Sequence, residues 1–325
     1  FSLNVAPRVA YRKNASWDVF RNAVEANPTT PIMDPKDPSL YYNFKGQAAG
    51  YNPLELLKKD KSTGTTKLLD WDGTVKLNLL PLLLNKEDRQ TLTTQLTFAD
   101  HQYDNYNQWF RPSTSTLAIN AGREGEASQD YSKSAIRTLE WVTNYANSFG
   151  NHNFKVMAGY SYQYEQYSGL NAANKDFPND ALEDNNLGSG TYAKDEGELG
   201  MGSYKNDSKL ISFFGRVSYD WKGRYMLTAS LRHEGSSKFG EHHKWGNFPA
   251  ISAGWRISDE AFMAGTKSWL TDLKLRGDFG ITGNQSFDSY RSLNTMSGFG
   301  YYLYNGKYYQ VWGPGKNVNP DLRWE

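Results

Sequence analysis

The sequence predicts an all-β chain that forms part of a large antiparallel transmembrane β-barrel. Apolar and polar residues alternate with a period of two over long stretches, short turns alternate with long polar inserts, and aromatic residues gather beside the short turns. Soluble β-sandwiches usually have strands of ~5 to 6 residues, whereas a membrane-spanning strand needs ~9 to 11. Several segments keep their alternation for that longer distance, so their length favours a membrane barrel.

Composition excludes several other classes of protein. The 325 residues include 36 basic and 35 acidic side chains, and a formal net charge of +1 gives no long-range attraction for nucleic acid. A mean hydropathy of −0.73 and the lack of an apolar run near ~18 residues argue against transmembrane helices. Without cysteine there is no disulfide and no thiolate-ligated metal. The chain opens without a signal-peptide pattern and closes on what reads as a new strand, so we expect a fragment of a longer protein.

The N-terminal half alternates strand patterns with inserts. We expect strands over residues 1–12, 67–79, 91–106, 138–145 and 154–165, the second and third of them joined through 84–90. Apolar residues at helical spacing predict short helices over Trp17–Ala26 and Pro53–Lys59. The polar tract Asn171–Asp207 shows no sustained period, which predicts a long loop.

The alternation is clearest in the C-terminal third. Ile211, Phe213 and Val217 share one face of a strand whose other face carries Ser212 and Arg216. Equivalent patterns predict strands over residues 210–221, 225–234, 251–257 and 273–281, which brings the total to about ten.

Aromatic residues mark the strand ends that adjoin short turns. Tyr219, Trp221 and Tyr225 surround one such turn, and Tyr145 and Phe149 precede another. Aromatic side chains gather where membrane strands meet the interface, so we expect an aromatic belt at one membrane surface. We also expect Trp255 to face lipid at mid-membrane depth.

Ionisable side chains occupy the positions between the apolar ones. So many charged groups cannot be buried in a dry core without pairing, and we expect an interior that is wet or plugged. Large barrels have such an interior, whereas small ones fill with side chains. The lumen-facing candidates are Arg8, Arg12, Glu140, Arg216, Arg232, Arg256 and Arg276.

A second candidate site is an aromatic cluster near the C-terminus. Its members are Tyr301, Tyr302, Tyr304, Tyr308, Tyr309 and Trp312. Aromatic faces stack on sugars and contact peptides or partner proteins, so these residues are candidates for ligand or lid contact, with a strand end in the aromatic belt as the alternative. No Gly-x-Ser-x-Gly elbow accompanies the five histidines, and we expect no catalysis, no metal site and no cofactor.

Several sequence blocks, in one order, resemble the SusC/RagA family of TonB-dependent outer-membrane transporters. The blocks are Tyr225–Arg232, Gly235–Gly240, Trp245–Ile257, Leu273–Arg276, Gly280–Gln285 and Asn319–Glu325, with Asn27–Ile32 and Asn52–Leu54 upstream. The resemblance implies a 22-stranded barrel. Residues 1–325 would supply about half of its strands as a partial barrel domain, without the plug domain, the TonB box and the signal peptide.

The same resemblance implies a function. The parent protein would import glycans or peptides across the outer membrane of a Gram-negative, Bacteroidetes-type bacterium. A SusD-like surface lipoprotein would act as its lid, outer-membrane lipid would surround it, and the TonB complex would energise it through the N-terminal region. The alternative is a soluble carbohydrate-binding β-sandwich or adhesin, whose aromatic residues would form a ligand platform.

Overall fold

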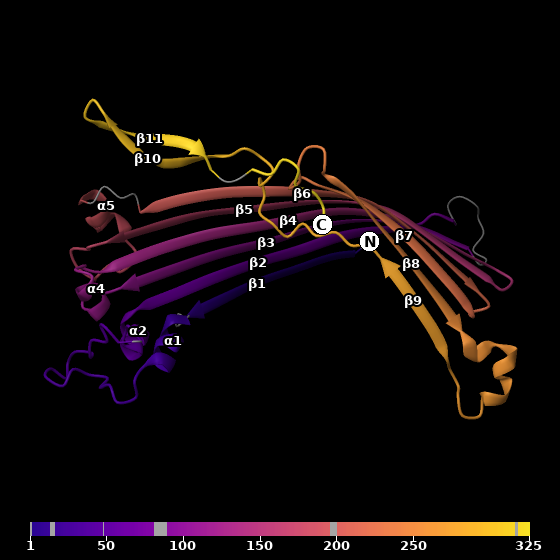
Figure 1. The fold of residues 1–325 in the computed structure, drawn as a ribbon, viewed down its shortest axis with the longest axis horizontal. Helices are drawn as coiled ribbons and strands as arrows, with labels where there is room; N and C mark the ends of the chain where they lie inside the picture. Colours follow the sequence, from indigo (N-terminus) through magenta and orange to yellow (C-terminus); the bar gives the residue numbers. More distant parts are fainter. Residues whose placement is uncertain (1, 14–16, 48, 81–89, 196–199, 316–317) are drawn as a thin grey trace.

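The computed structural model describes residues 2–13, 17–47, 49–80, 90–195, 200–315 and 318–325, and these form one curved antiparallel sheet with a separate hairpin (Figure 1). Nine strands follow one another in sequence order across the sheet, so each hydrogen-bonds to its neighbours along the chain, and β1 and β9 lie at the edges. The hairpin pairs β10 with β11. The prediction of an all-β, barrel-type antiparallel fold is confirmed, and the described residues do not form the two stacked layers of a sandwich.

The strands differ greatly in length. Their bounds are β1 Ser2–Lys13, β2 Lys61–Asn78, β3 Gln90–Arg111, β4 Glu126–Phe149, β5 His152–Lys175, β6 Met201–Trp221, β7 Tyr225–Ser236, β8 Trp245–Arg256, β9 Lys274–Gly280, β10 Met296–Tyr304 and β11 Lys307–Pro314. Strands β4 and β5 have 24 residues each, about twice what a bilayer requires. They are therefore long enough to extend well beyond a membrane.

Both predicted helices are present, at the end of the sheet that carries the long inserts (Figure 1). The short helical segments are α1 Trp17–Glu25, α2 Pro53–Lys59, α4 Thr116–Asn120, η1 Leu187–Ser189, α5 Tyr192–Asp195, η2 Ile257–Asp259 and η3 Ala261–Thr266. In the described part of the chain, none of the helices has the length and apolar character needed to cross a membrane.

Tight turns close the opposite end of the sheet. Phe149 pairs with His152 across one turn, and Trp221 pairs with Tyr225 across another. In the second turn Lys222 and Gly223 have φ values of 54° and 67°, which reverse the chain within a few residues. The predicted join over 84–90 lies, except for Gln90, outside the described residues.

The predicted loop over Asn171–Asp207 is too long. Strand β5 continues to Lys175 and β6 already begins at Met201, while β4 starts at Glu126 rather than near residue 138. In these outer parts of the strands polar residues occupy both faces, so the alternation that marks a half-apolar strand is missing from the sequence. The backbone ladder nevertheless continues, with Asn171 paired to Gly202.

The outer face of the sheet carries a band of apolar side chains. Directly paired residues lie on the same face of a sheet, and the register joins Trp141 to Tyr160 and Tyr160 to Phe213. Trp141 is 53% exposed and Phe213 is 50% exposed, so the protein itself leaves these large side chains uncovered. A contiguous uncovered apolar surface of this kind suits contact with lipid.

This apolar band ends part of the way along the strands. Leu139, paired to Phe98, belongs to its last row. The next residues on the same face, Arg137 and Asp100, are also paired, and their side chains lie 3.6 Å apart. Buried apolar packing appears further along, where Phe110, Ala127 and Phe177 form a small core beneath the long inserts.

The aromatic residues predicted at the turns do cluster there. The rings of Trp221 and Tyr225 stack with centroids 5.5 Å apart, and Tyr225 stacks on Trp255 at 6.4 Å. The mid-membrane position expected for Trp255 is wrong, because Trp255 is one residue from the end of β8. Val217 and Ile251, both of them paired to Ala229, occupy the middle of the same face.

Candidate functional site

The seven predicted lumen residues all occupy the face opposite the apolar band. Glu140 pairs with Ser161, and Ser161 pairs with Ser212, next to Phe213 on β6 but on the reverse side. The register connects four further members to this face: Arg8 pairs with Leu68, Arg12 with Gly64, Arg216 with Ser230 and Arg232 with Phe214. The positions of Arg256 and Arg276 lie on the side away from Trp255 and Leu275, their neighbours on the outer face. The register therefore puts these positions on one face of the sheet, and their contact with a lumen stays a prediction.

Arg232 is held in a polar cluster on this inner face. Its guanidinium donates to the Glu234 carboxylate, with Nε 2.9 Å from Oε1, and to the Ser212 hydroxyl oxygen at 2.8 Å. Ser212 is fully buried and donates to Glu234 in turn. The Glu234 carboxylate thus compensates the charge, and the guanidinium also lies over the Phe214 ring, 5.6 Å from its centroid.

Other arginines of this face are exposed as well. Arg8, Arg216 and Arg276 are exposed, and Arg216 lies diagonally across from Arg232 because its cross-strand partner Ser230 is two residues away. Arg256 lies at the turn end, 3.9 Å from Asp259 and 3.7 Å from Asp272. The described side chains among these candidates thus form a dispersed charged wall rather than one compact binding site.

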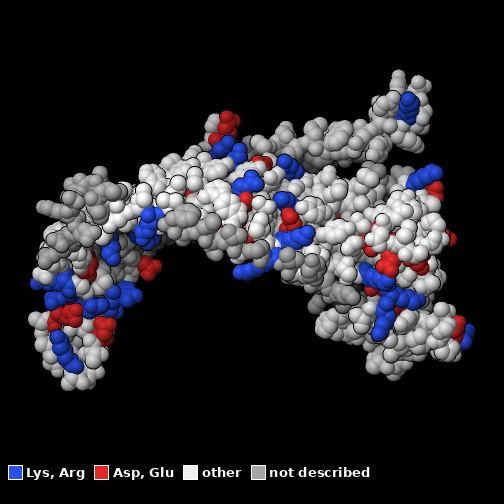
Figure 2. Space-filling view, turned by 180° about the vertical axis from the view of Figure 1, so that it is seen from behind, with Lys and Arg blue, Asp and Glu red and all other residues white. Residues whose placement is uncertain are grey.

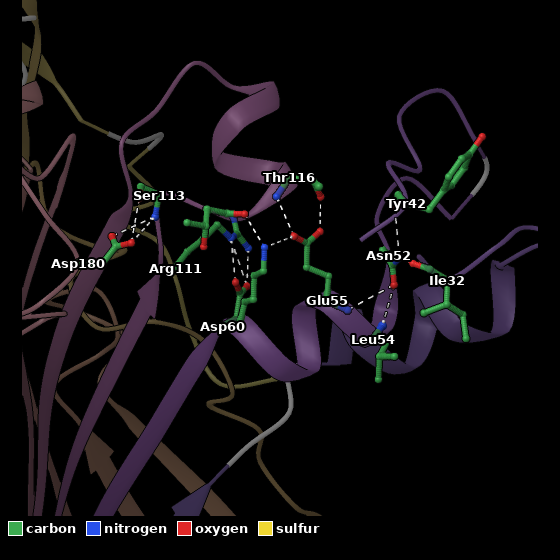
Figure 3. Close-up of polar contacts among 12 residues, drawn as sticks. Ile32, Tyr42, Asn52, Leu54, Glu55, Asp60, Arg111, Ser113, Thr116 and Asp180 are labelled. Carbon is green, nitrogen blue, oxygen red and sulfur yellow. Dashed lines mark hydrogen bonds and ion pairs between the residues drawn. The ribbon is translucent and has the colours of Figure 1, made fainter. Parts of the chain in front are cut away.

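The loop end contains a buried charge cluster that the sequence analysis missed. Arg111, the last residue of β3, donates to Asp60 with Nη2 2.7 Å from Oδ2, and to Glu126 at 3.2 Å (Figure 3). Burial raises the pKa of Asp60 above its ordinary value, while the hydrogen bonds and charge of Arg111 act in the opposite direction. The cluster joins the start of β2 to the facing ends of β3 and β4.

Helix α2 fastens two of the inserts together (Figure 3). The Asn52 side chain caps the helix by accepting from the amides of Leu54 and Glu55, and its own amide donates to the Ile32 carbonyl at 2.8 Å. Glu55 accepts from the backbone amide of Thr116 at 2.9 Å, which ties the helix to the insert before β4. The loop end is therefore a braced platform.

The acidic insert between β5 and β6 is part of the same platform. Asp180 accepts from the amide of Ser113 at 3.0 Å and from its hydroxyl at 2.9 Å (Figure 3). Gln108 donates to the carboxylate of Asp184, and Gln129 donates to its carbonyl at 2.8 Å. Acid-to-amide and acid-to-hydroxyl pairs at long sequence separation carry no local sequence pattern, so the sequence could not reveal this role.

The predicted tyrosine cluster lies on the projecting hairpin β10–β11. Tyr302 pairs with Tyr309, and their ring centroids are 5.8 Å apart, while Tyr304 lies 6.4 Å from Tyr309. Tyr301 and Tyr308 occupy positions of the opposite face and are 68% and 73% exposed. Lys307, at the tip, is the single charged residue of the hairpin sequence, and the tip shows one blue patch in Figure 2.

Comparison with known proteins connects this architecture to one family. The family model described as TonB dependent receptor-like, beta-barrel, matches residues 14–325. TonB-dependent receptor P26 of Formosa agariphila is 28% identical over 94% of this chain and 30% of its own length. TonB-dependent receptor SusC of Bacteroides thetaiotaomicron is 27% identical over 93% of this chain and 30% of its own length.

A solved structure of the RagAB peptide transporter has the same fold. It superposes with a TM-score of 0.73 and 17% sequence identity, over 99% of this chain and 35% of the transporter chain. The chain thus spans about a third of the length of these relatives. On the family-model match over nearly its entire length, the chain belongs to the TonB-dependent receptor-like β-barrel family.

Proposed function

We propose that this chain forms part of the wall of a nutrient importer in the outer membrane. The observation that carries the proposal is the two-sided sheet, whose outer face is apolar over the turn-side half of the strands and whose inner face is charged. The barrels of this family are outer-membrane proteins, and the apolar band suits their lipid contact. In a bilayer β1 and β9 would pair with further strands, because an open sheet edge is too costly in lipid.

In this proposal the charged inner face lines the lumen or contacts a plug. Arg8, Arg216 and Arg276, which are exposed, would meet water, substrate or plug. The ion-paired Arg232 would instead stiffen the wall. The positions of Arg12, Glu140 and Arg256 belong to the same face and would line the same space.

The loop platform and the tyrosine hairpin would meet the lid and the substrate. A SusD-like surface lipoprotein is the partner we propose, supported by the SusC relative and by the fold shared with the RagAB transporter. Braced loops lose little conformational entropy when a partner binds, and exposed tyrosines supply contact area with hydrogen-bonding tips. The Tyr302, Tyr304 and Tyr309 face of the hairpin is the contact we would test first.

The remaining elements of the proposal concern the complete protein. It would take up glycans or peptides, would be energised by the TonB complex through its N-terminal region, and would act without catalysis or a cofactor. The protein would occur in a Bacteroidetes-type Gram-negative bacterium, and the Formosa and Bacteroides relatives support this proposal.

Fractionation and co-purification of the full-length protein test this function. We expect it in the outer-membrane fraction, extracted only by detergent, with a surface lipoprotein bound. Recovery in buffer without detergent would contradict the importer and favour a soluble adhesin.

A matched pair of hairpin variants then tests the lid contact. Changing Tyr302, Tyr304 and Tyr309 to Ser should reduce lipoprotein recovery or substrate uptake without preventing outer-membrane assembly. Changing Tyr301 and Tyr308 to Ser provides the control on the opposite face of the same hairpin. Equal effects from both sets, or none, would argue against a contact through the first face.

A further inference from the structure

The connection between β8 and β9, residues 257–273, has two chemically different sides. It lies at the turn end of the sheet and contains η2 and η3 (Figure 1). On the side of the charged inner face, Asp259 and Asp272 approach Arg256, and Ser258 donates to Asp272 at 3.3 Å. Figure 2 shows Lys and Arg beside Asp and Glu at both ends of the sheet.

The other side of the connection joins the aromatic residues of the outer face. Phe262 contacts the edge of Trp255, with centroids 6.5 Å apart and an angle of 67°. Trp255 is stacked on Tyr225 and Tyr225 on Trp221, so four rings run from β6 across β7 and β8 into the connection. Phe262 therefore extends the lipid-side aromatic row beyond the last strand residue.

Glu260 holds this arrangement together. Its carboxylate accepts hydrogen bonds from the Tyr225 hydroxyl, from the Trp255 indole nitrogen at 2.9 Å and from Arg224 Nη1 at 2.9 Å. The Tyr225 hydrogen bond is the main reason why the pKa of Glu260 lies below its ordinary value. The polar tips of two belt residues are thus satisfied by the connection, which fixes its position against the outer face.

Two large aromatic residues of the connection are uncovered. Phe262 is 68% exposed and Trp269 is 74% exposed. Aromatic residues at the end of a lipid-facing band partition to the headgroup region of a bilayer. Because Phe262 continues the aromatic row of the outer face, this side of the connection suits contact with phospholipid.

We propose that the β8–β9 connection is a membrane-surface anchor, in which Phe262 and Trp269 enter the phospholipid headgroup region at the turn end of the barrel and Glu260 fixes the connection in place. The anchor rests on the proposed function, because it requires the apolar band to lie in a bilayer. It adds an element outside the strands that fixes the depth and tilt of this part of the wall.

Fluorescent labelling in phospholipid vesicles tests the anchor. This chain has no cysteine, so single cysteines at positions 262, 269, 217 and 307 can carry a bimane label, with any cysteine elsewhere in the full-length protein changed to Ser. The vesicles contain phosphatidylethanolamine and phosphatidylglycerol, with a spin label near the headgroup or deep in the chain. At 262 and 269 we expect headgroup-level spin labels to quench about threefold more than at the hairpin-tip control 307.

The four positions separate failure of the anchor from failure of the wall. Quenching at 217 by the deep spin label, with 262 and 269 resembling 307, would overturn the anchor while the barrel wall stands. Absence of quenching at 217 as well would overturn the proposed function itself. Protection of 262 and 269 from both lipid and aqueous quenchers would mean that protein covers them, which also overturns the anchor.

A substitution tests the role of Glu260. In Glu260→Ala, with 217 still quenched to show that the barrel has assembled, headgroup quenching at 262 should fall about twofold, because the connection loses its attachment to Tyr225 and Trp255. Unchanged quenching at 262 would overturn the assignment of Glu260 as the positioning residue of the anchor.

Discussion

The two halves of the long strands β3 to β6 share one backbone ladder, but their outer faces differ in chemistry. In the turn-side half the outer face carries Trp141, Tyr160 and Phe213, and the protein leaves Trp141 and Phe213 uncovered. In the loop-side half it carries pairs such as Asp100 with Arg137 and Asp104 with Lys133, 3.9 Å apart. The difference teaches that the surface chemistry changes along a strand while the hydrogen-bonding pattern does not. In the proposed function the bilayer therefore surrounds the turn-side half only.

The largest expected effect comes from placing a charge on the turn-side outer face. Val217→Arg should cost ~2 to 4 kcal/mol, because an arginine near the membrane midplane must leave water or distort the bilayer. The measurement is the unfolding free energy of the full-length protein in vesicles, together with its yield in the outer membrane. Ser203→Arg, on the same face of β6 but in the loop-side half, is the matched control and should change neither. Similar costs for both would break the comparison.

The next effect concerns the charge cluster of the loop-side half. Arg111→Ala leaves the largely buried Asp60 and Glu126 without their shared partner, and should lower the local opening free energy by about 2 kcal/mol. Hydrogen exchange should speed up at the loop-side ends of β2 to β4 while the turn-side half stays protected. Lys133→Ala removes a longer, partly exposed ion pair with Asp104 and should lower this free energy by less than Arg111→Ala does. Faster exchange along the full length of the strands would contradict the view that the two halves open independently.

A smaller effect is expected on the inner face of the turn-side half. Glu234→Ala removes the partner of Arg232, which is itself almost half exposed, so the cost should be about 1 kcal/mol. The conservative Glu234→Gln retains a hydrogen-bond acceptor for Ser212 and Arg232 and should recover part of it. The measurement is the unfolding free energy in vesicles. A cost as large as that of Val217→Arg would mean that the inner face is dry.

The smallest effect is a pH dependence at the turn end. The pKa of Glu260 is lowered by its hydrogen bonds from Tyr225 and Trp255 and by Arg224, so its ionised form stabilises the folded connection. That contribution is complete above the ordinary value of 4.5 and is lost as the pH falls through the lowered folded value. A label at position 262 should therefore keep its headgroup quenching at neutral pH and lose it only in stronger acid. In Glu260→Gln the same profile should be flat, and an identical profile in both would exclude Glu260 as its source.

The parts of the fold that the sequence predicted are those in which one face is apolar. Ile211, Phe213 and Val217 alternate with polar residues. This alternation predicted the strand and its two faces, and it predicted that Arg216 lies on the polar face; the same pattern in the next strand placed Arg232. Strand ends between Asn171 and Asp207 were missed because both faces are polar there, so no alternation distinguishes a strand from a loop. The depth of Trp255 was misjudged because periodicity fixes the face of a residue and not its distance from the strand end.

The candidate site was predictable to the same extent. The face of each lumen candidate followed from its parity along a strand. The contacts of Arg111 with Asp60 and of Asp180 with Ser113 instead span 51 and 67 residues and depend on how the inserts meet. Such pairs have no local signature. The tyrosine hairpin was visible in composition, but its division into two faces required the register of β10 and β11.

One measurement tests the central claim most directly: spin labels at successive outward positions of β6 in the full-length protein, with collision rates for oxygen and for an aqueous nickel chelate. Between Ile211 and Trp221 we predict high oxygen and low nickel accessibility, as for lipid contact. Between Met201 and Lys209 we predict the reverse. A uniform profile along β6, or nickel accessibility at positions 213 and 217, would contradict a sheet whose turn-side half alone faces the membrane.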